Sequence, residues 1–162
     1  MNLRPIRILA LDMATTTGYA ILASDVLTSG SQCFAKQTAT KTRAAAHVGA
    51  SHAMFDNWLT EMLHGPRYDE IVYEMAGFFK SAAAVQVCVG FRGILLAHAA
   101  KHNIPLYSYS PSAVKKFWTG KGTAKKPEMI ARTKNEYPNL DITDDNECDA
   151  IALLKLHLHL TQ

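Results

Sequence analysis

Hydrophobic positions fall into two patterns along the chain. Short continuous apolar runs bounded by turn residues are typical of buried strands. Such runs occupy residues 6–12, 19–23, 27–34, 69–74 and 104–109, with a turn at 14–18 between the first two. Longer stretches with apolar residues three or four positions apart indicate helices. These cover residues 42–63, 81–102, a short helix from Ser110-Pro111 to Gly120, 125–135 and 145–160.

The order of these elements predicts the fold class. Three successive strands favour an antiparallel meander, whereas strands separated by helices favour parallel crossovers. We therefore expect an α/β fold with a mixed five-stranded sheet flanked by helices, in a single domain over residues 1–162.

Composition narrows the class of protein. Hydrophobic residues make up 48% of the 162 positions and charged residues 19%, so the chain can bury a core. The longest charge-free apolar stretch in a helical context ends at Arg92 after 11 residues, too short to cross a bilayer. The apolar run near the N-terminus is too short for a signal peptide. We expect a cytoplasmic protein with no membrane partner.

Charge is distributed unevenly along the chain. Residues 115–134 hold seven Lys or Arg against one Glu, and residues 141–149 then hold five acids and no base. A basic surface beside an acidic cluster suits a nuclease, in which cations hold phosphates and carboxylates hold metal ions.

Three acids stand where a ligand site would form. Asp12 and Glu74 each end a predicted central strand, and open α/β sheets bind their ligands at that edge. Asp149 lies one turn inside the last predicted helix, which is apolar beyond it and must therefore pack on the sheet. Capping and the helix dipole explain Asp144, Asp145 and Glu147, and Asp144 and Glu147 have the spacing of a capping box. They do not explain Asp149.

Carboxylates from separate elements suit hard cations such as Mg²⁺ or Mn²⁺. Two such ions about 3.5–4 Å apart can activate a water and stabilise the leaving oxygen in phosphodiester hydrolysis. Histidines do not offer a competing site, because His98 and His102 have the spacing of a metal pair without a third ligand on their helix.

Several short motifs, in order along most of the chain, resemble the RuvC family of Holliday-junction resolvases, which belongs to the ribonuclease-H-like superfamily. The matching motifs are Leu-Ala-Leu-Asp12 six residues before Gly18-Tyr19, Val-Tyr-Glu74, Arg92-Gly93, Pro105-Leu-Tyr-Ser-Tyr, Val114-Lys115, Gly120-x-Gly122-x-Ala124-x-Lys126 and Asp149-Ala150.

The resemblance implies a homodimeric endonuclease that nicks two strands symmetrically at a four-way DNA junction. It implies two Mg²⁺ ions per active site, with Mn²⁺ as a substitute. Asp12, Glu74 and Asp149 fall on family catalytic acids, and Lys115 and Lys126 fall on lysines that face the DNA near the cleaved phosphate. We expect Lys126 to be catalytic as well, because either it or Lys115 offsets the charge that builds on the phosphate. The expected DNA contacts as a whole are Phe78, Lys80, Lys115, Lys116, Lys121, Lys125 and Lys126.

Two positions depart from the family pattern. The fourth metal ligand, usually Asp or His three residues before the last Asp, is Asn146 here, and either Asn146 or Asp145 could take that place. The aromatic that the family carries three residues after its glutamate is replaced by Gly77. Phe78 and Phe79 follow at once, and we expect Phe78 to stack on a junction base.

The helix over residues 81–102 gives a separate reason to expect a dimer. It is apolar on nearly all sides and carries a stripe of small residues, Gly90, Gly93 and Ala97. Such a helix needs cover on more than one side, and a second copy of the chain can supply it.

Other functions remain open. The chain could be a ribonuclease-H-like nuclease acting on other branched or hybrid nucleic acids, or a weakly catalytic junction-binding protein, given Asn146. Leu11-Asp12-x-x-Thr15-Thr16 is also similar to the first phosphate loop of sugar kinases and actin-like ATPases, but those enzymes need two domains.

Overall fold

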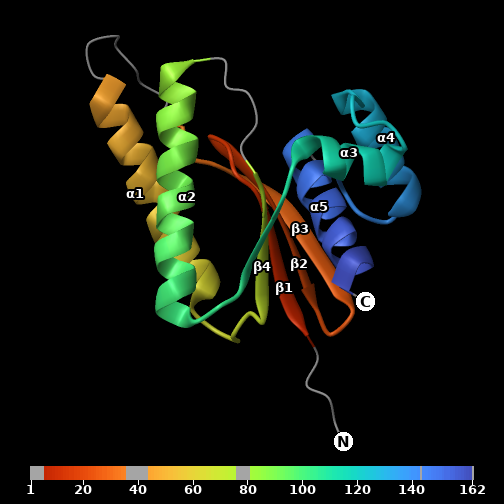
Figure 1. The fold of residues 1–162 in the computed structure, drawn as a ribbon, viewed down its shortest axis with the longest axis horizontal. Coiled ribbons are helices and arrows are strands. Elements are labelled where there is room, and N and C mark those ends of the chain that lie inside the picture. The colour runs from red at the N-terminus through yellow and green to blue at the C-terminus, as the bar shows by residue number, and fades with distance from the viewer. Residues whose placement is uncertain (1–5, 36–43, 76–80, 143, 162) are drawn as a thin grey trace, which may run out of the picture.

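Five strands form one mixed sheet in the order β3-β2-β1-β4-β5 (Figure 1). The computed structural model describes residues 6–35, 44–75, 81–142 and 144–161. The strands are β1 (Arg7–Asp12), β2 (Thr16–Ala23), β3 (Val26–Cys33), β4 (Glu70–Glu74) and β5 (Leu106–Tyr109). The pairs β1–β2 and β2–β3 are antiparallel, and β1–β4 and β4–β5 are parallel. The predicted meander followed by parallel crossovers is therefore confirmed.

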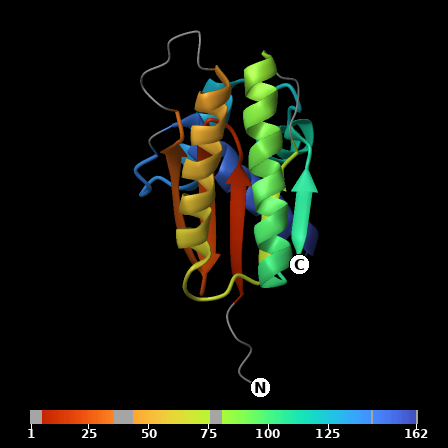
Figure 2. The ribbon, with the colours of Figure 1, turned by 90° about the vertical axis from the view of Figure 1, so that its left-hand side faces the viewer.

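The helices cover the two faces of the sheet (Figures 1 and 2). One face carries α1 (Ala44–Leu63) and α2 (Ala82–His102). The other carries α5 (Asp145–Thr161), with α3 (Pro111–Thr119) and α4 (Lys126–Glu136) packed beside it. Ser110 caps α3, as its place before Pro111 predicts, by accepting a hydrogen bond from the backbone N–H of Ala113.

The first turn is shorter than the sequence predicts. Residues 14–18 were expected to form it, but β2 already begins at Thr16, because the β-branched Thr16 and Thr17 extend the strand and pair with β3. The following hairpin turns at Ser24 and Asp25, both with positive φ of 50° and 64°. Two such residues form the tight turn whose twist matches that of the strands.

Strand alternation decides which side chains reach which face. Ile8, Ala10 and Val72 are buried against α5, whereas Leu9 and Ile71 are buried against α1 and α2. Because successive side chains point to opposite faces, the residues two positions beyond Ala10 and Val72 lie on the α5 side. These residues are Asp12 and Glu74, so both acids point toward the helix that carries Asp149.

Helix α2 is only partly covered. Its inward side is buried, but Val85, Val89 and Leu96 are exposed, Val89 by 58%. By length and composition alone, the 21 residues of α2 could span a membrane. This differs from the expectation based on the short charge-free stretch before Arg92. Core helices of soluble proteins pass the same test. The exposed apolar side distinguishes α2 from α5, which is buried along most of its length.

Candidate active site

Asp12 and Glu74 are brought together by the pairing of β1 and β4. Leu11 and Tyr73 are partners in this parallel pair, so the residue after each stands at the same level of the sheet. Neighbouring strands lie about 4.8 Å apart. The two carboxylates therefore start from adjacent backbones and point to the same face.

Asp149 reaches this edge because the first turn of α5 sits close against β2 and β3. Gly18, the β2 partner of Asp12, has no side chain, and a Cβ there would overlap the backbone carbonyl of Asn146. From β3, the hydroxyl of Ser31 donates to the carboxylate of Asp144. Asp144 in turn caps the helix by accepting from the backbone N–H of Glu147 over 2.9 Å.

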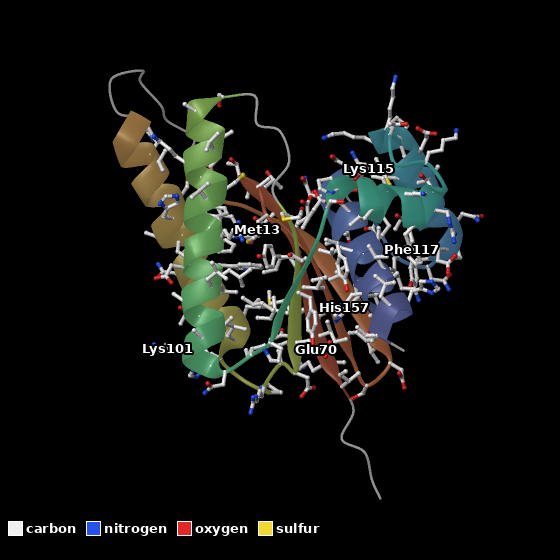
Figure 3. The ribbon with its side chains drawn as sticks, viewed as in Figure 1. Met13, Glu70, Lys101, Lys115, Phe117 and His157 are labelled. Atoms are coloured by element: carbon white, nitrogen blue, oxygen red, sulfur yellow. The ribbon has the colours of Figure 1, made fainter. Side chains whose placement is uncertain are left out.

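The buried side chain of Glu147 adds a second link to the sheet. Its carboxylate accepts a hydrogen bond of 2.7 Å from the hydroxyl of Ser29 on β3. The far end of α5 is also held, because the buried His157 contacts Glu70 at the start of β4 (Figure 3). The helix that carries Asp149 is thus fixed to the sheet at both ends.

Burial and mutual repulsion raise the pKa of all three acids. Burial raises the pKa of Asp12 well above its ordinary value of 3.8, and the negative charges of Glu74, Asp149 and Asp145 raise it further. Burial and Asp149 raise the pKa of Glu74 to about 7. The pKa of Asp149 is raised to about 6, by burial first and then by Asp145. The carboxylates at positions 12, 74 and 149 therefore crowd one place.

Two lysines only partly offset this charge. Lys115 on α3 lowers the pKa of Asp12, Glu74 and Asp149, which places its ammonium near all three (Figure 3 shows Lys115 and Met13 at the same end of the sheet). Lys126, at the start of α4, forms an ion pair with Asp145 and is 75% exposed. The three acids keep raised pKa values despite these lysines, chiefly because they are buried and also because carboxylates repel one another there.

The donor set fits divalent cations that share the site with a substrate. In the described parts of the chain, no group of three or more His, Cys, Asp or Glu side chains is arranged so that it could hold a metal ion by itself. Mg²⁺ seldom needs one, because it commonly binds one or two carboxylates and completes its shell with water and substrate phosphates. Oδ1 of Asp149 is buried without a hydrogen-bond partner among the described residues, so it has an acceptor position free for such an ion.

Comparisons with known proteins agree with this geometry. The profile of the family described as "Crossover junction endodeoxyribonuclease RuvC" matches residues 8–157. The chain belongs to the RuvC family. A RuvC from Agrobacterium fabrum is 26% identical over 157 residues, covering 96% of this chain and 91% of the relative, and one from Petrotoga mobilis is 36% identical over 105 residues, covering 63% of each.

Solved structures show the same fold. Thermus thermophilus RuvC in complex with a Holliday junction substrate superposes with a TM-score of 0.69 at 20% identity, covering 94% of this chain and 93% of that one. The yeast mitochondrial Holliday junction resolvase gives a TM-score of 0.60 at 13% identity, covering 93% and 77%. The ribonuclease-H-like fold class expected from the resemblance is thereby confirmed.

Asn146, the position that departs from the RuvC pattern, is engaged with the helix cap. The side chain of Asn146 hydrogen-bonds to the carboxylate of Asp144. Burial raises the pKa of Asp144, but hydrogen bonds from Ser31, the helix backbone and Asn146 outweigh burial and lower it. Asp145 instead adds its charge to Asp12 and Asp149. Of the two candidates for the fourth ligand, Asp145 is the one that carries a charge, and this charge acts on Asp12 and Asp149.

The other expected DNA contacts divide into two groups: lysines that form a basic rim, and residues that the structure does not describe. Lys116, Lys121 and Lys125 are exposed on α3, on the loop after it and at the start of α4, beside Lys115 and Lys126. Lys121 also pairs with Glu128 over 3.3 Å. Phe78 and Lys80 lie outside the described residues, so their expected contacts stay predictions.

The positioning residues Gly18, Ser29 and Ser31 were not predicted to have a role in the site. In the sequence motif, Gly18 served only to define a spacing. The two serines lie in an edge strand that contains no candidate catalytic residue. A hint existed in the small and hydroxyl-bearing pattern of β3, Val-Leu-Thr-Ser-Gly-Ser, which is typical of a strand approached closely by another element.

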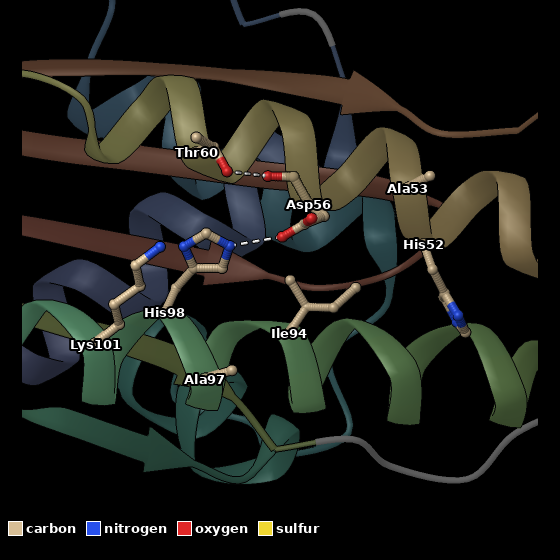
Figure 4. A pocket seen from close by; sticks show the side chains of 8 residues that line it. All are labelled: His52, Ala53, Asp56, Thr60, Ile94, Ala97, His98 and Lys101. Carbon is tan, nitrogen blue, oxygen red and sulfur yellow. Dashed lines mark hydrogen bonds and ion pairs between the residues drawn. The ribbon is translucent and has the colours of Figure 1, made fainter.

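A hollow between α1 and α2 lies on the opposite face of the sheet (Figure 4). It has a volume of about 450 Å³, and the carboxylate of Asp56 lies 2.6 Å from Nε2 of His98 inside it. Because Asp12 and Glu74 point to the α5 face, this hollow is separate from the candidate active site.

Proposed function

We propose that this RuvC-family protein is a structure-selective endonuclease that resolves four-way DNA junctions by symmetric, metal-dependent phosphodiester hydrolysis. The observation that carries the proposal is the gathering of Asp12, Glu74 and Asp149 at one sheet edge, where burial and mutual repulsion raise their pKa values. Family membership supplies the reaction class, because the matching relatives are named crossover junction endodeoxyribonucleases.

Two Mg²⁺ ions per site, or Mn²⁺ in their place, are the proposed cofactor. Bound there, they would supply an activated water and stabilise the departing 3′ oxygen. Asp12, Glu74 and Asp149 are proposed to hold these ions, with Asp12, whose carboxyl senses the charge of both other acids, as the shared ligand. Lys126, or Lys115, whose charge reaches all three acids, is proposed to offset negative charge as it builds on the phosphate.

The basic rim around the acids fits a DNA backbone. Lys116, Lys121, Lys125 and Lys126 are exposed next to the site, and the segment with Phe78 and Lys80 directly follows β4, the strand that carries Glu74. We propose that these lysines bind phosphates of the junction arms and that Phe78 stacks on a base. Junction affinity should therefore fall steeply as the salt concentration rises.

A homodimer is proposed from the exposed side of α2. Val85, Val89 and Leu96 leave an apolar surface uncovered in the single chain. We propose that a second copy, and not a lipid bilayer, covers it, since two identical subunits also match the twofold symmetry of a four-way junction. The bacterial relatives suggest that the enzyme works in the cytoplasm of a bacterial cell or of a phage-infected host, as one domain over residues 1–162.

One observation favours a second candidate function. Asn146 brings no charge to the family's fourth ligand position, and its amide is engaged with Asp144. A chain that lacks this ligand could bind junctions and cut them slowly or not at all.

A single assay separates these functions. Labelled four-way junctions and RNA–DNA hybrids are incubated with the protein, with and without Mg²⁺. Paired nicks placed symmetrically on opposite strands, only with Mg²⁺, are expected. Degradation of the hybrid in preference to the junction would assign another nuclease activity. A gel shift without any cut would assign the binding role.

A further inference from the structure

The first turn of α5 offers two residues for the fourth ligand position. Asp145 precedes Asp149 by four residues and Asn146 precedes it by three, so both positions neighbour Asp149 on the helix surface. Helical spacing alone does not choose between them, but the contacts that each residue makes distinguish them.

Asn146 is committed to the helix cap. Its side-chain amide bonds to the carboxylate of Asp144, which also accepts from Ser31 and from the backbone N–H of Glu147. Its backbone carbonyl packs against Gly18, so the backbone at Asn146 lies close against β2. Moving the Asn146 amide into the active site would break the cap that fixes the start of α5.

Asp145, by contrast, is charged and already binds a cationic side chain. Its carboxylate, 22% exposed, is paired with the ammonium group of Lys126. Its negative charge also acts on Asp12 and Asp149, so it belongs to the same cluster. Nearby, Oδ1 of Asp149 is buried and has no partner among the described residues.

We propose that Asp145, and not Asn146, supplies the fourth carboxylate of this active site, and that Lys126 occupies that carboxylate until a divalent ion replaces it. The inference rests on the proposed metal-dependent function. Lys126 is largely solvent-exposed, and exposed ion pairs are weak, so a divalent ion can displace it. Once displaced, the ammonium is free to move to a DNA phosphate.

Titration calorimetry of Mn²⁺ binding to the DNA-free protein at pH 8 tests the assignment without relying on activity. Asp145→Asn should weaken Mn²⁺ binding about ten-fold or more, because even groups that only orient a metal ligand are worth about 10–100-fold in affinity. Asn146→Ala should change it less than two-fold. Lys126→Met should strengthen binding by removing the competing cation, whereas Lys134→Met, at the exposed far end of the same helix, should leave it unchanged.

The opposite pattern overturns the proposal: weaker binding in Asn146→Ala with wild-type binding in Asp145→Asn. Weaker binding in Lys126→Met overturns the placeholder role of Lys126. Asp12→Asn separates this inference from the function on which it rests. If Asp12→Asn also binds Mn²⁺ like the wild type, the metal site itself is wrong and Asp145 has no ion to hold. Circular dichroism spectra check that each variant is folded.

Discussion

Nε2 of His157, near the end of α5, lies 2.6 Å from the carboxylate of Glu70 at the start of β4. From Glu70 to Glu74 the strand rises by about 13 Å, and from His157 back to Asp149 the helix rises by about 12 Å. Because these two lengths nearly match, the contact at one end of the sheet places Asp149 level with Glu74 at the other. The buried pair acts as a spacer for the active site.

Glu70→Ala should therefore affect both stability and chemistry. His157 is fully buried, and without Glu70 its Nε2 loses its partner while Nδ1 keeps the 3.0 Å contact with the Tyr109 hydroxyl. Leaving one buried polar group unpaired costs about 1–3 kcal/mol of unfolding free energy. Urea unfolding measures this loss, and we expect junction cleavage to fall as well because α5 is no longer held level.

The hollow between α1 and α2 supplies a matched control for that variant. Asp56→Ala removes the carboxylate from another 2.6 Å contact with a histidine, but Asp56 is half exposed and water can replace it. It should cost less than about 1 kcal/mol. Equal losses in Glu70→Ala and Asp56→Ala would contradict the spacer role.

Gly18→Ala should disable cleavage through the helix backbone. The added methyl group would occupy the place of the Asn146 carbonyl, so β2 and the first turn of α5 must separate. We expect a loss of about 1–3 kcal/mol in unfolding free energy, as is usual for overpacking, and a large fall in the single-turnover rate of junction cleavage.

Gly49→Ala makes the same chemical change in open space on α1. It should stabilise the protein by up to about 1 kcal/mol, because alanine favours helix over glycine. Wild-type cleavage by Gly18→Ala would show that the close approach does not position Asp149.

The metal-free protein should lose stability as the pH rises from about 4 to about 7. Glu74 and Asp149 have ordinary pKa values of 4.5 and 3.8, raised in the folded state to about 7 and about 6. The folded chain thus holds protons that the unfolded chain has already released, and stability falls with pH across that window. At pH 8 both acids are charged, and their repulsion opposes ionisation of the buried Asp12.

Asp12→Asn should remove much of that repulsion. We expect it to raise the unfolding free energy of the metal-free protein by about 1–2 kcal/mol at pH 8, and by little at pH 4. Mn²⁺ should raise the Tm of the wild type more at pH 8 than at pH 5, and should barely change that of Asp12→Asn. Thermal unfolding at both pH values measures these shifts, and a destabilised Asp12→Asn at pH 8 would argue against the crowded site.

Lys115→Met should impair cleavage more than it impairs binding. Its ammonium lowers the pKa of Asp12, Glu74 and Asp149, so its loss raises those pKa values and moves the pH profile of cleavage upward. Lys116, the exposed neighbour on α3, provides the comparison, since Lys116→Met should weaken junction affinity and reduce its salt dependence without moving the pH profile. Cleavage rates from pH 6 to 9 distinguish the two, and identical profiles would remove Lys115 from the site.

Much of the site follows from strand pattern alone. An acid at the end of each central strand, in phase with Ala10 and Val72, predicts that Asp12 and Glu74 share a face, and an apolar helix after Asp149 predicts which element covers it. The close contact of Gly18 with Asn146, and the cap that holds the Asn146 amide, depend on how nearly α5 approaches β2 and β3. That distance is set by packing between remote segments, and no local pattern encodes it.

The exposure of α2 shows the same limit. Its sequence is apolar on nearly all sides and predicts cover on more than one face, yet the single chain covers only the side that contains Phe91 and Leu95. A hydrophobic pattern predicts that a helix needs cover. It does not record whether the same chain or a second copy buries it.

The most direct test of the central claim compares Asp149→Asn with the wild type on a labelled four-way junction in Mg²⁺. The substitution removes a charge and keeps the shape, so cleavage should fall by at least about 100-fold while junction binding in a gel-shift assay is retained or strengthened. Asp141→Asn, an equivalent change in the exposed loop before α5, should cut like the wild type. Symmetric nicking by Asp149→Asn at the wild-type rate would contradict the account.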